Sequence, residues 1–244
     1  MTLPGSEAHS ARVEVSVILP VYNGQRYMRE ALDSVLQQQF DDARAAFELI
    51  VIDDGSTDDS ADIIAEYARR DTRIRARRQD NAGVTAARNA GIAGARGRFL
   101  MFIDQDDRFT PGALQTHLAA YAREPELGYS LAQQRCFLQP GSEVPAWFKL
   151  QQLDKPVPGY LPGTLCARRE TFVTLGTFDE RFPISSDADW FARGRDAAVP
   201  MRLLPQVTLE RRIHDANQSR HSSVIHRELA QLLGESIRRK RARS

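Results

Sequence analysis

The sequence has few cysteines, no long apolar run and no excess of charge of either sign. Its two cysteines, Cys136 and Cys166, form no CxxC pair, which excludes a cysteine zinc site and a disulfide framework and favours buried reduced thiols. The longest apolar stretches, such as residues 15–21 and 99–103, are much shorter than the ~18 residues of a membrane span. With 33 Lys and Arg against 32 Asp and Glu, the charge argues against a dedicated nucleic-acid-binding protein. We therefore expect a cytoplasmic protein without a transmembrane segment or a nucleic-acid partner.

Strands and helices are predicted to alternate in the first half of the chain. The runs at 15–19, 47–52 and 99–103 are continuous, apolar and rich in β-branched residues, which favours strands buried on both faces of a parallel sheet. Apolar residues at helical spacing follow the first two runs, at 27–36 and 61–68. This alternation predicts an α/β fold with a Rossmann-like, mainly parallel sheet flanked by helices.

The remaining elements are predicted from weaker patterns of the same kinds. The expected helices are 85–95, 113–123, 169–175, 187–196 and 224–239, the expected strands are 74–77, 129–137 and 201–209, and a Pro-rich loop is expected at 139–164.

Polar clusters follow three of the predicted strands. Tyr22 and Asn23 follow the first, Asp53 and Asp54 follow the second, and the cluster 104–107 follows the run at 99–103. A capped turn is the alternative for each cluster alone, and for residues 53–59 taken by themselves it is the better explanation. The carboxyl ends of parallel strands share one edge of a sheet, where ligands bind, so the coincidence of three clusters favours a binding site.

The cluster Asp104-Gln105-Asp106-Asp107 is the least explicable by structure alone. Three carboxylates within four residues repel one another and raise one another's pKa unless a cation offsets them. Oxygen ligands of this kind suit Mg²⁺ or Mn²⁺ bound together with substrate phosphates. The alternative is a solvated, Asp-rich helix start.

Four motifs together resemble the family 2 inverting glycosyltransferases of the GT-A fold. They are PVYNG at 20–24, IDDGSTDDS at 52–60, NAGVTAARNAGI at 81–92 and FIDQDD at 102–107. The resemblance implies a GT-A type domain with a small acceptor-side extension, and a nucleotide-diphosphate sugar, with UDP favoured, as the donor.

The expected organisation follows from this resemblance. Residues 1–13 are a flexible leader and 14–244 form a single glycosyltransferase domain. That domain comprises a nucleotide-binding half at 14–110, an acceptor-side half at 111–220, and a carboxyl-terminal helix with a basic tail at 221–244.

The resemblance also assigns roles in the first half of the chain. Asp104 and Asp106 match the Asp-X-Asp pair that holds a divalent cation, Mn²⁺ or Mg²⁺, and the ribose-diphosphate. Asp54 matches the residue that accepts from the uracil imide N–H, and Arg88 matches a basic residue that contacts the nucleotide. The residues that match the border of the base are Pro20, Val21 and Tyr22.

In the second half, Asp187 matches the presumed general base. It lies in Ser186-Asp187-Ala188-Asp189-Trp190, where the family has Glu in place of Ser186. His214, in the segment 211–219, matches a histidine that reaches the metal or the diphosphate. Inverting displacement of a nucleoside diphosphate needs one base on the acceptor hydroxyl and a positive site at the departing diphosphate, and these residues can supply both.

Two alternatives differ from this hypothesis. A sugar nucleotidyltransferase would need a Gly-rich basic loop after the first strand, which 20–24 is not. A non-catalytic nucleotide-sugar-binding protein would not need Asp104, Asp106 and Asp187 together.

The expected acceptor is a carbohydrate or another hydroxyl-bearing molecule. The basic tail 238–243 is explained most simply as a solvated helix end, and weak contact with an anionic membrane surface is the alternative.

Overall fold

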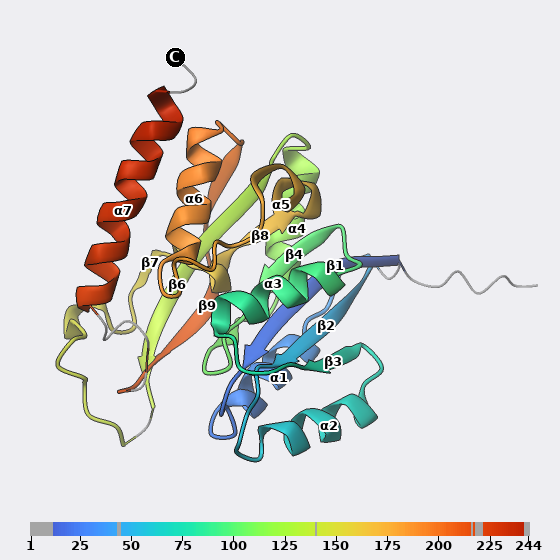
Figure 1. Ribbon diagram of the computed structural model, residues 1–244. Helices are drawn as coiled ribbons and strands as arrows, with labels where there is room; N and C mark the ends of the chain where they lie inside the picture. The colour runs from blue at the N-terminus through green and yellow to red at the C-terminus, as the bar shows by residue number, and fades with distance from the viewer. Residues whose placement is uncertain (1–11, 43–44, 140, 216, 218–221, 242–244) are drawn as a thin grey trace, which may run out of the picture.

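The computed structural model describes residues 12–42, 45–139, 141–215, 217 and 222–241, which form a nine-stranded sheet covered by helices (Figure 1). The strands are β1 Arg12–Val21, β2 Ala45–Asp53, β3 Ile74–Arg78, β4 Phe99–Phe102, β5 Arg108–Phe109, β6 Tyr129–Leu138, β7 Pro156–Pro158, β8 Cys166–Arg168 and β9 Met201–Ile213. The α-helices are α1 Met28–Leu36, α2 Ser60–Arg70, α3 Val84–Gly94, α4 Ala113–Arg123, α5 Arg169–Leu175, α6 Ser186–Asp196 and α7 Ser222–Arg241. Two short 3₁₀ turns, η1 Leu150–Gln152 and η2 Pro162–Thr164, complete the order.

The first half of the sheet is parallel, as the sequence predicts. Strands β3, β2, β1 and β4 are neighbours in this order, and each pairing among them is parallel. Strand β1 begins at Arg12, which pairs with Ala45, so the last two residues of the predicted leader 1–13 belong to the sheet. The rest of that leader lies outside the described residues. The parallel arrangement brings the carboxyl ends of β1, β2 and β4 to one edge.

The second half of the sheet is mixed. The prediction of a mainly parallel sheet did not say where antiparallel pairings would occur. Strand β8 is antiparallel to β4 and β6, β9 is parallel to β6, and β5 is antiparallel to β9. Strand β7 lies within the predicted loop 139–164 and pairs with β6. These three unpredicted strands, β5, β7 and β8, have only two or three residues each, too few for a periodic pattern. The two prolines of β7 are tolerated because the segment pairs with one neighbour only.

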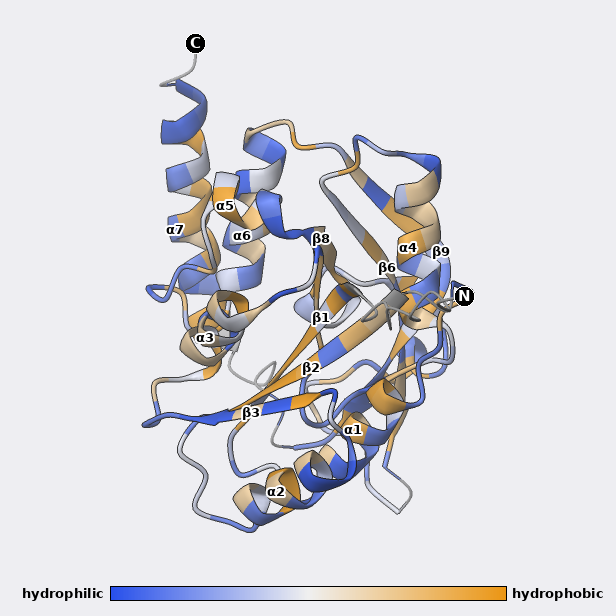
Figure 2. Ribbon diagram, turned by 90° about the vertical axis from the view of Figure 1, so that its right-hand side faces the viewer, coloured by the Kyte–Doolittle hydropathy of each residue, from blue (hydrophilic) through white to orange (hydrophobic). Residues whose placement is uncertain are grey.

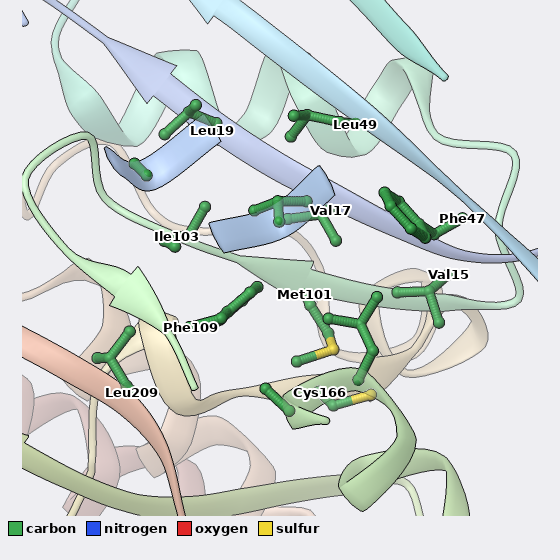
Figure 3. Close-up of a cluster of buried hydrophobic side chains, with 14 of the residues drawn as sticks. Val15, Val17, Leu19, Phe47, Leu49, Met101, Ile103, Phe109, Cys166 and Leu209 are labelled. Atoms are coloured by element: carbon green, nitrogen blue, oxygen red, sulfur yellow. The ribbon is translucent and has the colours of Figure 1, made fainter. Parts of the chain in front are cut away.

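Both faces of the sheet are buried, which explains the continuous apolar runs. Val15, Val17 and Leu19 of β1 pack with α1, α2 and α4 on one face, and Figure 3 shows this cluster. Ile18 packs on the other face, with residues of α3, α5 and α6. There, a Cβ on Gly91 of α3 would come 2.4 Å from Ile18, so the close approach of this helix to β1 requires glycine. Figure 2 shows the hydrophobic strands between the two helical layers.

Candidate active site

The turn after β4 carries the Asp-X-Asp pair and is tied to the end of β1. The side chain of Gln105 accepts from the backbone N–H of Tyr22 at 2.8 Å and donates to the Tyr22 carbonyl at 3.0 Å. This reciprocal pair holds the turn 104–107 against the first strand. The prediction that the clusters after β1 and β4 lie together is thereby confirmed, and Gln105 is a positioning residue that the sequence patterns did not identify.

Asp104 forms an ion pair with Arg88. A guanidinium nitrogen of Arg88 lies 2.5 Å from Asp104 Oδ1, and the Arg88 residue is only 7% exposed. Arg88 comes from α3, whose packing on β1 sets its position. The buried cation thus faces the edge of the sheet where a diphosphate is expected.

Asp106 meets His214 across a separation of 108 residues in sequence. His214 Nε2 lies 2.8 Å from Asp106 Oδ2, and the Asn217 amide donates to the same oxygen at 3.2 Å. Asn217 also accepts from the backbone N–H of His214 at 2.7 Å, which fixes the end of β9. The ring of Tyr27 packs against the imidazole with a centroid distance of 5.1 Å. Asp106 and His214, both predicted metal ligands, are therefore brought together.

The third carboxylate of the turn, Asp107, faces inward. It is 3% exposed and accepts from the backbone N–H of Arg212 at 2.8 Å. Burial raises the pKa of Asp107 well above its ordinary value, and the charges of Asp106 and Asp104 raise it further. The crowding of negative charge anticipated from the sequence is thus present in the fold.

The donor set at this turn suits a hard divalent cation. Carboxylates of Asp104 and Asp106 with the imidazole of His214 are ligands that Mn²⁺ accepts. Within the described part of the chain, however, no three His, Cys, Asp or Glu side chains are already arranged around a common metal position.

Asp54 is buried at the end of β2 and is bound by the loop that precedes α3. Its Oδ1 accepts from the Gln79 amide at 2.8 Å and the Ala82 N–H at 2.9 Å, and its Oδ2 accepts from the Gly83 N–H at 2.8 Å. A carboxylate has about four acceptor positions, so one remains for a further donor. Asp54 is therefore also the anchor of the loop 79–83, a role that the sequence did not predict.

The other residues predicted to border the base differ in exposure. Tyr22 is 48% exposed, whereas Val21 is 1% exposed and Pro20 is buried. The Val21 carbonyl accepts from the Asp54 N–H at 2.7 Å. Of these three residues, only Tyr22 therefore offers a side chain to a bound nucleotide.

Asp187 lies in the first turn of α6 and is partly buried. Its Oδ1 accepts from the Ala188 N–H at 2.7 Å. Burial raises the pKa of Asp187; the charge of Arg88 opposes this shift and that of Asp104 reinforces it. The influence of both charges places Asp187 within electrostatic range of the Arg88–Asp104 pair.

Contacts of α3 with residues 178 and 186 join the two predicted halves of the chain beside Asp187. The hydroxyl groups of Thr85 and Ser186 lie 3.1 Å apart, and both residues are buried. The Asn89 side chain donates to the Phe178 carbonyl at 2.9 Å and accepts from the Phe178 N–H at 3.1 Å. The departure from the family pattern at Ser186 is thus part of the contact that places Asp187. A cavity of about 260 Å³ lies beside it, lined by residues 82–85, 180, 183 and 184.

Other residues weighed in the sequence have structural roles. Trp190 is fully buried among aromatic rings, and both cysteines are buried free thiols, as expected. His117 of α4 is fully buried with Nδ1 2.8 Å from Ser130 Oγ, and burial lowers its pKa to about 3. None of the helices in the described part of the chain combines the length and hydropathy needed to cross a bilayer.

The α/β fold, with a mixed sheet flanked by helices, is of the GT-A type. Residues 16–180, more than half of the chain, match the family described as Glycosyl transferase family 2. The chain belongs to this family.

Among known proteins, the chain is 40% identical over 113 residues to the uncharacterized glycosyltransferase EpsJ of Bacillus subtilis (strain 168), covering 46% of this chain and 31% of EpsJ. The chain thus spans about a third of the length of that relative.

Solved structures share the fold at lower identity. TarS 1-349 of S. aureus in complex with UDP-GlcNAc superposes with a TM-score of 0.68 at 23% identity, covering 86% of this chain and 61% of that one. The mannosyltransferase PcManGT from Pyrobaculum calidifontis, in complex with GDP-Man and Mn²⁺, superposes with a TM-score of 0.70 at 18% identity, covering 94% and 66%.

Proposed function

We propose that this chain is a metal-dependent inverting glycosyltransferase that moves a sugar from a UDP-sugar to an acceptor hydroxyl. The observation that carries the proposal is the convergence of Asp104, Asp106, Arg88, His214 and Asp187 on one edge of the sheet. Metal-ligating groups gather at the turn 104–107, and Asp187 lies within electrostatic range of the Arg88–Asp104 pair. Positive charge there suits a leaving diphosphate, and a carboxylate suits an acceptor that must lose a proton.

The first half of the chain would hold the donor. Asp104, Asp106 and His214 would hold Mn²⁺ or Mg²⁺, and the chemistry that such a cation supplies is neutralisation of charge on the leaving diphosphate. Arg88 adds a fixed positive charge beside Asp104. Asp54 would accept the uracil imide proton through its remaining acceptor position, with the exposed ring of Tyr22 beside the base. The fold relatives with bound UDP-GlcNAc and with GDP-Man and Mn²⁺ support donors of this class.

The second half would hold the acceptor, with Asp187 as the base. A carboxylate whose pKa is raised by burial is a stronger proton acceptor than an ordinary one. One base suffices, since an inverting displacement forms no covalent intermediate with the protein.

Calorimetry with UDP tests the donor site, and donor hydrolysis tests catalysis. We expect UDP to bind with Mn²⁺ and to bind much more weakly with EDTA. We then expect one of UDP-glucose, UDP-galactose or UDP-N-acetylglucosamine to be hydrolysed, and hydrolysis of a GDP-sugar alone would contradict the UDP assignment. Metal-dependent binding with no turnover of any donor would favour a non-catalytic binding protein. Formation of a nucleotide sugar from UTP and a sugar 1-phosphate would favour a nucleotidyltransferase. UDP affinity unchanged by EDTA would contradict the metal assignment.

A further inference from the structure

Helix α7 lies at the outer edge of the molecule and has one face fixed to the protein (Figure 1). On that inner face Glu228 accepts from the backbone N–H of Ser185 at 2.8 Å, and Leu232 is 4% exposed. Ser236 donates to Asp196 at 3.0 Å, as does Arg239. The helix is therefore held in a defined rotation about its axis, and its remaining sides are presented to the surroundings.

An exposed side of the helix, called here the outer face of α7, carries a row of large apolar side chains; it lies one residue step, about 100°, round the helix from the inner face. Leu229, Leu233 and Ile237 are 43%, 63% and 45% exposed. A spacing of four residues places successive members one turn apart on the same side of the helix. Figure 2 shows hydrophobic and hydrophilic segments alternating along α7, as expected for an amphipathic helix.

Charge is segregated across α7 in the same way. The helix has two acidic residues, and both turn inward: Glu228 is 5% exposed and the Glu235 side chain is 16% exposed. Basic side chains are exposed on the rest of the helix. Those of Arg238 and Lys240 are 73% and 62% exposed while they pair at long range with Glu235 at 4.0 Å and Asp196 at 3.9 Å, and Arg227 is also exposed. The exposed sides of α7 thus combine apolar side chains with positive charge, and the negative charge of the helix is turned toward the protein.

We propose that the outer face of α7 is a docking surface for an anionic lipid bilayer. Apolar side chains on such a helix enter the boundary between headgroups and acyl chains, and the exposed cations bind anionic headgroups. A second copy of this chain fits the surface less well, because two such faces would bring their cations together. Charge complementarity therefore selects the anionic membrane surface as the occupant.

The surface is separate from the proposed active site, so the two proposals can fail independently. None of Leu229, Leu233, Ile237, Arg238 and Lys240 belongs to the edge of the sheet that carries Asp104 and Asp106.

Vesicle co-sedimentation of the full chain tests the proposal. We expect binding to vesicles of equimolar phosphatidylcholine and phosphatidylglycerol, little binding to phosphatidylcholine alone, and weakening at high salt because headgroup attraction is screened. Leu233→Gln should weaken binding at least about tenfold, the scale of one leucine kept out of an apolar environment. The double variant Arg238→Gln and Lys240→Gln should weaken it by a similar factor and reduce the salt dependence.

The matched control is Val173→Gln, which removes another exposed apolar side chain, 82% exposed on α5, and should bind as the parent does. Melting temperature shows that each variant is folded, and UDP affinity shows that the donor site is intact. Equal binding to both kinds of vesicle, absence of binding, or parental binding by both α7 variants would overturn the proposal. A dimer that Leu233→Gln dissociates, without vesicle binding, would also overturn it.

Discussion

Replacing Asp187 by Asn separates catalysis from structure at the proposed base. The substitution removes the negative charge but keeps the size of the side chain, and the amide oxygen can still accept the Ala188 N–H, now bonded at 2.7 Å. The residue at the N-cap of α6 is Ser185, so Asp187 is not the cap itself but lies within the first turn. The variant therefore retains the local hydrogen bond and loses only the charge.

The effect on stability should be small. A carboxylate in the first turn of a helix contributes about 0.3–1 kcal/mol through the helix dipole, which the variant loses. Burial raises the pKa of Asp187, so the charged form is already disfavoured at this position. Removing the buried charge therefore recovers part of the stability that the variant loses at the helix dipole. We expect the free energy of unfolding to change by less than about 1 kcal/mol, a shift of about 2–4 °C in Tm for a chain of this size.

The effect on turnover should be much larger. A positioned base contributes about 10² to 10⁴ in rate, equivalent to about 3–5 kcal/mol of activation free energy. The raised pKa also predicts that the rate of the parent falls on acidification at a higher pH than an ordinary aspartate would cause, because the base must be ionised. This dependence should be absent from the Asn variant.

Three measurements on Asp187→Asn distinguish a catalytic from a structural role of this residue: Tm, UDP affinity with Mn²⁺, and the rate of transfer or donor hydrolysis. The control is Asp189→Asn, since Asp189 is 1% exposed and pairs with Arg193 at 2.7 Å. The control should lose stability but keep turnover per folded molecule. A stable Asp187→Asn variant with parental turnover would refute the assignment. Asp179 would be a poor substitute, because hydrogen bonds from Arg181 lower its pKa.

Three further predictions concern the donor site and the core. Asp106→Ala should weaken metal-dependent UDP binding by about 2 kcal/mol or more in calorimetry, the scale of a lost charged partner, and parental affinity would remove Asp106 from the metal site. Asp54→Asn should cost less UDP affinity than Asp54→Ala, because it keeps one acceptor oxygen, and equal affinity of the parent for ADP and UDP would contradict base recognition there. Glu48 is 4% exposed; although burial opposes the shift, hydrogen bonds from Ser16 and Arg75 hold its pKa below the ordinary value. Its ionised form therefore contributes stability above that ordinary value, and this contribution is lost as pH falls through the lowered pKa. Glu48→Gln should lower the free energy of unfolding by about 2 kcal/mol at neutral pH. Chemical denaturation at a series of pH values should then show a smaller loss of this free energy on acidification than in the parent, and an unchanged pH dependence would contradict this.

Much of the fold was predictable because its elements carry local periodic patterns. Helices α4 and α5 begin and end at the predicted residues, and α6 begins one residue earlier than expected. Strands β5, β7 and β8 were not predicted, since two or three residues have no period and their pairing depends on distant segments.

The alternation of buried strands and amphipathic helices is encoded in local hydrophobic patterns, and with it the edge where the polar clusters after β1, β2 and β4 meet. Three contacts of the site have no such local signal: His214 with Asp106, Gln105 with Tyr22, and Ser186 with Thr85. The same holds for the face of α7 that is covered. Such contacts join segments far apart in the chain, so they depend on how the elements pack, which no local pattern encodes.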